Sequence, residues 1–323
     1  MDKLADLLCN ISIEQSKKVS YKEEKKTYFE IKQDSLSIKE RILEFGKNKL
    51  IGIFLPNSIA FIETFFAIQF AERIPVLLPT IERNEALCRM IIDTNIDLII
   101  TDTEHKKILV EELEHFEHSV NIYNVDTDKV SVKRGEKKAD NLLNSELNDV
   151  AVVIKTSGTI EQPKYIMLTH KGVLGNIKAH INSVNYSKDE NTLIFLPMCF
   201  GYCLSSQMLA HIYMNASIHI SNTPFDCMRF VNDVYINKIT NTTTVSAVIS
   251  LLARYIRIGA IDIEKLSQLK LLIFGGMPIA MEDIETVRNA LPNTKLIQTY
   301  GQTEHSPRTV SYTHLTLPTM AVV

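Results

Sequence analysis

Residues 152–164 read Val-Val-Ile-Lys-Thr-Ser-Gly-Thr-Ile-Glu-Gln-Pro-Lys, an apolar run that ends in hydroxyl groups, a glycine and a lysine. The β-branched residues at 150–154 predict a buried strand, and the polar residues after them predict a loop at its carboxyl end. Hydroxyl groups and free backbone N–H groups bind phosphate oxygens, and a lysine neutralises their charge. The segment therefore indicates a phosphate-binding loop, with an ordinary polar turn between strand and helix as the alternative.

The loop is not that of an ordinary P-loop NTPase. The pattern G-x-x-x-x-G-K-[ST] requires a glycine before the lysine and a hydroxyl group after it. Here Pro163 precedes Lys164 and Tyr165 follows it.

Apolar runs alternate with helical patterns on both sides of this loop. Strands are predicted at 50–55, 96–101, 150–154, 269–274 and 295–299, and helices are predicted after Ser58, Thr169 and Pro278. Strands that alternate with helices predict an α/β fold of layered parallel sheets with flanking helices, whose ligands lie at the carboxyl ends of the strands. The polar residues 126–148 are expected to form a surface connection within one large domain or two fused subdomains.

The composition is that of a soluble globular protein. The 323 residues include 45% hydrophobic and 23% charged residues, and the net charge of −3 gives no general attraction to nucleic acid or anionic membranes. The five cysteines are odd in number and form no C-x-x-C pair, so reduced thiols are expected. The chain opens without a signal peptide, and its apolar stretch at 59–71 is too short for a membrane span. These features predict a cytoplasmic protein without a nucleic-acid partner.

The loop resembles the phosphate-binding signature T-S-G-[ST]-T-G-x-P-K-G of the adenylate-forming superfamily, which includes acyl-CoA synthetases, adenylation domains and luciferases. The positions that match are Thr156, Ser157, Gly158, Thr159, Pro163 and Lys164. Ile160, Glu161 and Tyr165 depart from the family's usual Thr, Gly and Gly. Ile160 removes a hydroxyl group and Glu161 places a negative charge beside a polyphosphate, so both changes are expected to weaken ATP binding.

A second segment carries the same resemblance. Tyr300-Gly301-Gln302-Thr303-Glu304 matches the family's Y-G-x-T-E motif completely. The resemblance implies that Tyr300 packs on adenine, that Gln302 lies in the nucleotide site, and that Thr303 contacts the α-phosphate. It also implies that Glu304 helps to hold Mg²⁺, which makes Thr303 and Glu304 the expected catalytic residues. A metal ion and a hydroxyl donor would stabilise the charge that develops at the α-phosphorus.

Further residues of the expected ATP site follow from the resemblance. Gly275 and Gly276 occupy the place of the glycine-rich segment beside adenine, where the absence of a Cβ lets a backbone approach a flat base. The resemblance also implies that the matched loop at 156–164 holds the β- and γ-phosphates. The expected ligand of the whole site is therefore ATP with Mg²⁺.

The segment Leu196–Tyr202 looks like the family's segment that borders the acyl pocket. It contains no Asp, the residue that usually holds the α-ammonium group in amino-acid-activating members, and this favours a simple carboxylic acid. For Met198 and Cys199, packing in the core is an equal alternative to substrate contact. The resemblance implies that the acid becomes acyl-AMP with release of pyrophosphate, and that coenzyme A or a carrier-protein pantetheine accepts the acyl group.

The resemblance covers about residues 5–309, so residues 1–309 are expected to form the large N-terminal ATP-binding domain in incomplete form. The family's T-G-D motif, its hinge and its small C-terminal domain with a catalytic lysine have no counterpart here. Residues 310–323 are expected to be a non-native tail. This chain alone is therefore expected to be nearly inactive as an enzyme.

Two alternatives remain open at this point. One is a degenerate module that binds nucleotide or acyl group without turnover, which Ile160 and Glu161 favour. The other is an unrelated structural α/β protein whose loops match by chance. A metal site at His115 and His118 lacks a matched third ligand, and His170 fits a helix start as well as it fits a nucleotide contact.

Overall fold

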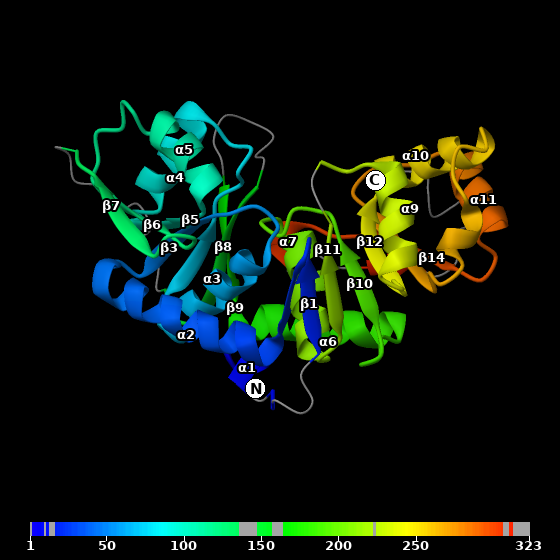
Figure 1. The fold of residues 1–323 in the computed structure, drawn as a ribbon, viewed down its shortest axis with the longest axis horizontal. Coiled ribbons are helices and arrows are strands. Elements are labelled where there is room, and N and C mark those ends of the chain that lie inside the picture. The colour runs from blue at the N-terminus through cyan, green and yellow to red at the C-terminus, as the bar shows by residue number, and fades with distance from the viewer. Residues whose placement is uncertain are drawn as a thin grey trace. The chain divides into compact units, whose positions relative to one another are not determined.

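The computed structural model describes residues 2–9, 11–12, 17–135, 147–156, 164–221, 224–305 and 310–312. The chain divides into two compact units. Unit 1 consists of residues 1–16 and 26–174, and unit 2 of residues 17–25 and 175–323. Each unit is built around its own β-sheet, and the two are described separately (Figure 1).

The seven-stranded sheet of unit 1 is parallel except at its two edge strands. In spatial order its strands are β7 (Lys129–Lys133), β6 (Val120–Asn124), β5 (Leu98–Thr101), β3 (Leu50–Phe54), β4 (Ile74–Leu77), β8 (Val150–Thr156) and β9 (Lys164–Thr169). The edge strands β7 and β9 are antiparallel to their neighbours. The predicted strands at 50–55, 96–101 and 150–154 are all confirmed, while β7 lies inside the stretch that was expected to be a surface connection.

Helices cover both faces of this sheet. They are α1 (Asp6–Cys9), α2 (Tyr28–Phe45), α3 (Ile59–Phe70), α4 (Asn84–Asp93) and α5 (Thr103–Glu112). Figure 1 shows α4 and α5 on one side of the sheet and α2 and α3 on the other. Leu87 and Met90 of α4 and Leu109 of α5 share one apolar cluster with strand residues such as Val76 and Val153. The alternation of side chains along each strand thus supplies an apolar face for each helical layer.

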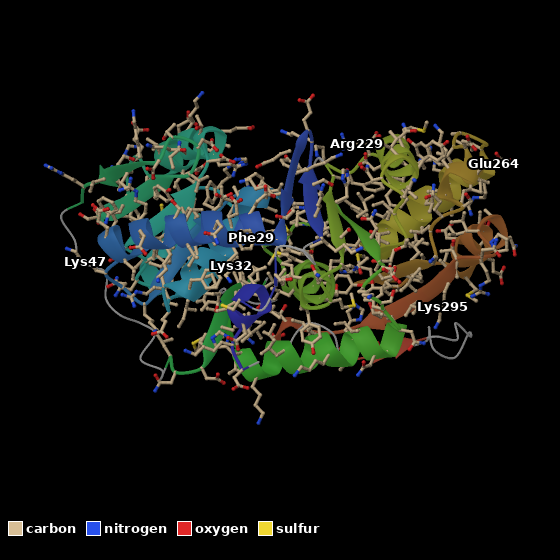
Figure 2. All side chains as sticks on the ribbon, turned by 60° about the horizontal axis from the view of Figure 1, so that its bottom comes forward. Phe29, Lys32, Lys47, Arg229, Glu264 and Lys295 are labelled. Atoms are coloured by element: carbon tan, nitrogen blue, oxygen red, sulfur yellow. The ribbon has the colours of Figure 1, made fainter. Side chains whose placement is uncertain are left out.

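The sheet of unit 2 has eight strands. In spatial order they are β15 (Val310–Tyr312), β14 (Lys295–Tyr300), β13 (Leu271–Gly275), β12 (Asn241–Val245), β10 (Asn191–Ile194), β11 (Ser217–Ile220), β1 (Lys18–Tyr21) and β2 (Glu24–Thr27). The strands from β14 to β1 are parallel, and β15 is antiparallel to β14. Lys295, labelled in Figure 2, marks the amino end of β14, so that Tyr300 lies at its carboxyl end.

The helical elements of unit 2 follow the order of the chain. They are α6 (His170–Val184, which begins in unit 1), α7 (Gly201–Cys203), the π-helix η1 (Leu204–Leu209), α8 (Ala210–Tyr213), α9 (Cys227–Ile236), α10 (Ser246–Arg257), the 3₁₀ turn η2 (Ile263–Leu266), α11 (Met281–Ala290) and the 3₁₀ turn η3 (Thr303–His305).

Both faces of this second sheet are also covered. Residues of α9, α10 and α11 share an apolar cluster with Leu272, Phe274 and Leu296 of the strands. Val184 of α6 packs with the alternate strand residues Leu271 and Ile273 on the opposite face. Among the described residues, no helix combines the length and the apolar character that a membrane crossing requires.

The fold class predicted from the sequence is confirmed: both sheets are mainly parallel and carry helices on both faces. The domain boundary expected at 309 stays a prediction. Of the expected tail at 310–323, the structure describes Val310–Tyr312, which form β15, and residues 313–323 lie outside the described residues.

Candidate functional site

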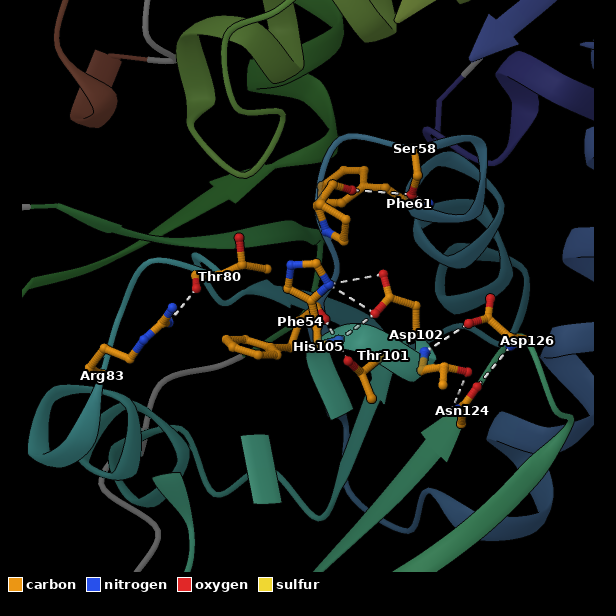
Figure 3. Close-up of polar contacts among 12 residues, drawn as sticks. Phe54, Ser58, Phe61, Thr80, Arg83, Thr101, Asp102, His105, Asn124 and Asp126 are labelled. Atoms are coloured by element: carbon orange, nitrogen blue, oxygen red, sulfur yellow. Dashed lines mark hydrogen bonds and ion pairs between the residues drawn. The ribbon is translucent and has the colours of Figure 1, made fainter. Parts of the chain in front are cut away.

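Polar side chains gather at the carboxyl ends of the parallel strands in unit 1, as Figure 3 shows. Ser58, which follows β3, accepts a hydrogen bond from the backbone N–H of Phe61 at 3.1 Å and caps α3, as the sequence predicts. Asp102, which follows β5, accepts from the backbone N–H of His105 at 2.7 Å and caps α5. These side chains satisfy helix N-termini, so they orient the edge of the sheet on which β8 also ends.

The loop predicted to bind phosphate connects two adjacent antiparallel strands. Thr156 is the last residue of β8 and Lys164 is the first residue of β9, and the register pairs them directly. Thr156 is half-buried and Lys164 is exposed. Because directly paired residues have their Cβ atoms about 5 Å apart, the two described ends of the loop bring a hydroxyl group and an ammonium group onto the same face.

The middle of this loop lies outside the described residues. This applies to the predicted ligands Ser157, Gly158 and Thr159, and also to Ile160 and Glu161. Their roles therefore stay predictions. What the structure adds is the placement of both ends of the loop on one edge of one sheet.

Two side chains beside this loop carry contacts that sequence reasoning missed. Lys155 Nζ lies 2.7 Å from Glu82 Oε1, and the hydroxyl of Tyr165 lies 2.9 Å from Asp93 Oδ2. Burial, together with the neighbouring Asp93 carboxylate, raises the pKa of Tyr165 well above its ordinary value. The signal that could have revealed them is strand alternation, which puts residues 155 and 165 on the face opposite to residues 156 and 164.

In unit 2, Gly275 and Gly276 lie at the carboxyl end of β13. The register places Gly275 beside Thr299 of β14, and a Cβ at Gly275 would lie 2.4 Å from the Thr299 carbonyl oxygen. Only glycine fits such a close backbone approach. Gly276 has a φ of +94°, in the region that favours glycine. The Ser246 hydroxyl donates to the Met277 carbonyl at 2.6 Å and fixes the turn that follows.

The segment Tyr300–Glu304 begins at the carboxyl end of β14, next to these glycines. Tyr300 is 45% exposed, and its hydroxyl accepts a hydrogen bond from the Gln302 side-chain amide at 3.0 Å. Thr303 and Glu304 follow in η3, where Thr303 is half-buried and Glu304 is exposed. The structure thus brings Gly275, Gly276 and the 300–304 segment together on two adjacent parallel strands.

The segment expected to border an acyl pocket divides into buried and exposed side chains. Met198 and Cys199 are buried, in agreement with the core-packing alternative, whereas Phe200 is 39% exposed. The Tyr202 hydroxyl lies 2.8 Å from Thr299 Oγ1. This contact ties the segment to the end of β14, immediately before Tyr300.

The histidines weighed from the sequence have structural positions. His170 is buried at the start of α6, and its Nδ1 accepts a hydrogen bond from the backbone N–H of Leu4 at 3.1 Å. Burial lowers the pKa of His170, which keeps the ring neutral as an acceptor. Within the part of the chain that the structure describes, no three His, Cys, Asp or Glu side chains form a metal-binding group.

Comparison with known proteins gives the same answer in sequence and in fold. Residues 14–321 match the model of the family described as AMP-binding enzyme. The sequence is 24% identical over 297 residues to 4-coumarate-CoA ligase 1 from Narcissus pseudonarcissus, covering 87% of this chain and 53% of that protein. It is 30% identical over 164 residues to 4-coumarate--CoA ligase 1 from Solanum tuberosum, covering 50% of this chain and 29% of that protein. The chain thus spans about half the length of the curated relatives that it matches.

Solved structures share the fold at low sequence identity. O-succinylbenzoate coenzyme A synthetase from Bacillus subtilis, in complex with AMP, superposes with a TM-score of 0.77 at 18% identity, covering 96% of this chain and 76% of that one. McyG A-PCP complexed with phenylalanyl-adenylate superposes with a TM-score of 0.79 at 16% identity, covering 99% of this chain and 61% of that one.

Proposed function

Because this chain belongs to the AMP-binding enzyme family, we propose that it is the ATP-binding part of an enzyme that activates a carboxylic acid as acyl-AMP. In this reaction a carboxylate oxygen attacks the α-phosphorus of ATP, the bond to the β-phosphate oxygen breaks, and pyrophosphate leaves with the electron pair. The acyl group then passes to the thiol of coenzyme A or of a carrier-protein pantetheine. The names of the curated relatives, which are CoA ligases, support this class of acceptor.

One observation carries the proposal: Gly275, Gly276 and the segment Tyr300–Glu304 lie together at the carboxyl ends of two adjacent parallel strands. Ligands of parallel α/β sheets bind at this edge. The glycines leave room for a flat base, and Tyr300 offers an exposed ring for stacking. Gln302 holds the Tyr300 hydroxyl and so orients that ring.

Charge neutralisation is the second part of the proposed chemistry. The carboxylate substrate is already ionised at pH 7, so no general base is needed and catalysis rests on positioning and on stabilising charge. Thr303 would donate its hydroxyl to the α-phosphate, and Glu304 would help to bind Mg²⁺ together with phosphate oxygens. The exposed carboxylate of Glu304 fits an oxygen-preferring ion that usually takes only one or two protein ligands. The metal supplies positive charge to the phosphates when it is bound.

In unit 1, Thr156 and Lys164 would bind the β- and γ-phosphates with the loop between them. Lys164 supplies an exposed ammonium group and Thr156 a hydroxyl group on the same face of the strand pair. We include Ser157, Gly158 and Thr159 in this proposed ligand set on the strength of the sequence pattern alone.

The proposal is tested by measuring the binding of Mg-ATP and of adenosine to the chain by calorimetry. Glu304→Gln is expected to weaken Mg-ATP binding about tenfold or more, because a charged ligand to the metal is lost, and to leave adenosine binding unchanged. Tyr300→Ala is expected to weaken both ligands. A chain that binds neither ligand would refute the proposed function.

The rival function is a module that binds nucleotide or acyl group without turnover, and Ile160 and Glu161 favour it. Mg-ATP affinity before and after Glu161→Gly separates the two, since a competent site should gain little from the change. A large gain would favour the degenerate module. We also propose that this chain alone forms acyl-AMP very slowly, and a readily measurable acyl-AMP yield from it would contradict that statement.

A further inference from the structure

The two strands that flank the phosphate-binding loop present their side chains to two different faces. In the antiparallel register, Thr156 pairs with Lys164 and Lys155 pairs with Tyr165. Directly paired residues share a face, and successive residues along a strand alternate between faces. The proposed phosphate ligands Thr156 and Lys164 therefore lie on one face, and Lys155 and Tyr165 lie on the other.

Helix α4 covers this second face. Its Leu87 and Met90 belong to the same apolar cluster as Val153, which precedes Lys155 by two residues and shares its face. Tyr165 and Met167 of β9 pack against this cluster. The helix is therefore seated on both strands.

Polar contacts then join the two ends of α4 to the two strands. At its amino end, Glu82 pairs with Lys155 at 2.7 Å, and the two side chains are only 24% and 14% exposed. At its last residue, Asp93 accepts a hydrogen bond from the Tyr165 hydroxyl at 2.9 Å. Arg89 lies 3.7 Å from the same carboxylate and keeps it on this side of the helix. Each strand is thus held at the residue that adjoins a described end of the loop.

We propose that α4 clamps both ends of the phosphate-binding loop, with Lys155 and Tyr165 as positioning residues that keep Thr156 and Lys164 directed toward the polyphosphate of ATP. The inference rests on the proposed function of that loop. Ends that are already fixed lose less conformational freedom when the ligand binds, which strengthens binding. Tyr165 stands where the resembling signature has glycine, the residue with the greatest backbone freedom, so the clamp restrains a position that is usually loose.

The experiment compares Mg-ATP and adenosine binding by calorimetry in the wild-type chain and in the double variant Tyr165→Phe/Glu82→Gln. Both substitutions keep the size of the side chain and remove the contact. Mg-ATP affinity is expected to fall about tenfold, and adenosine affinity and the melting temperature to stay near the wild-type values. Hydrogen exchange of residues 157–163 is expected to accelerate in the variant.

A matched control removes the same kind of bond elsewhere in unit 1. The Tyr123 hydroxyl donates to Asp128 Oδ1 at 3.1 Å, far along the sheet from β8 and β9, so Tyr123→Phe is expected to leave Mg-ATP affinity unchanged. Unchanged Mg-ATP affinity in the double variant would overturn the clamp alone. A joint loss of Mg-ATP binding, adenosine binding and melting temperature would reduce the contacts to general stability and also overturn it. A wild-type chain that binds no Mg-ATP would overturn the proposed function and the clamp with it.

Discussion

Unit 1 buries an acid where unit 2 buries a base. Glu63 of α3 lies inside unit 1 with its Oε1 2.7 Å from Lys26 Nζ, and burial raises the pKa of Glu63 to about 7 although Lys26 opposes the shift. His211 of α8 is fully buried in unit 2 with its Nδ1 2.8 Å from the Gln207 carbonyl oxygen. Burial lowers the pKa of His211 to about 4. Each environment favours the neutral form, but the neutral form of an acid is protonated and that of a base is not.

The largest predicted effect is an opposite response of the two units to acid. Glu63 binds its proton more tightly when folded, so unit 1 gains stability as the pH falls from about 7 toward the ordinary pKa of 4.5. His211 binds its proton more weakly when folded, so unit 2 loses stability as the pH falls from 6.5 toward about 4. Each change amounts to at most about 3 kcal/mol.

Native thiols report each unit separately, because Cys88 is half-buried in unit 1 and Cys203 is buried in unit 2. Thiol labelling of both residues across a urea series at several pH values measures the two stabilities. Glu63→Gln should flatten the response of unit 1 only, and His211→Gln that of unit 2 only. Parallel pH dependence in both units would break the comparison.

The second prediction concerns the close backbone contact of unit 2, which contrasts with the side-chain contacts that hold the strand ends of unit 1. Gly275→Ala would place a Cβ 2.4 Å from the Thr299 carbonyl oxygen, so it should cost about 1–3 kcal/mol of folding stability and abolish adenosine binding. Thermal unfolding and calorimetry measure the two effects.

A matched glycine serves as the control. Gly175 lies in α6 with nothing within 4 Å of its Cβ position, so Gly175→Ala should stabilise the chain by about 1 kcal/mol through helix propensity. If both alanine variants behaved alike, the steric explanation for Gly275 would be wrong.

The smallest predicted effect tests whether the two units also differ in helix capping. Ser58 caps α3 in unit 1 through a hydroxyl group at 3.1 Å, and Asp226 caps α9 in unit 2 through a carboxylate at 2.7 Å. Ser58→Ala and Asp226→Ala should each cost about 1 kcal/mol, because each leaves one backbone N–H without its partner. Chemical denaturation measures both, and a cost confined to one unit would show that capping here depends on the unit.

Strands with apolar β-branched residues could be predicted from the sequence, and those with polar residues could not. The strand at 50–55 is continuous in Leu and Ile, and its prediction is confirmed by β3. The central strand β12 reads Asn-Thr-Thr-Thr-Val, and its Thr242, Thr243 and Thr244 are fully buried. Hydropathy cannot reveal such a strand, because the burial of threonine is decided by the neighbouring strands and helices.

The candidate site divides in the same way. Motif spacing predicted that Gly275, Gly276 and the segment from Tyr300 would follow strands, and the structure places them at the carboxyl ends of β13 and β14. The partners of Lys155 and Tyr165 could not be predicted, because Glu82 and Asp93 lie more than seventy residues away along the chain. Only the strand register and the seating of α4 bring these residues together.

The π-helix Leu204–Leu209 makes chain length matter more than side-chain identity in one short stretch. Its Gln207 amide donates to the Leu193 carbonyl at 2.9 Å, and a π turn holds about one residue more than an α turn. Removing one residue here would restore an α-helix and rotate Ala210–Tyr213 by about 100°, which would turn His211 away from its buried position. Substitutions should therefore be tolerated in this stretch more readily than insertions or deletions, and relatives that lack one residue here should pack the helix before β11 differently.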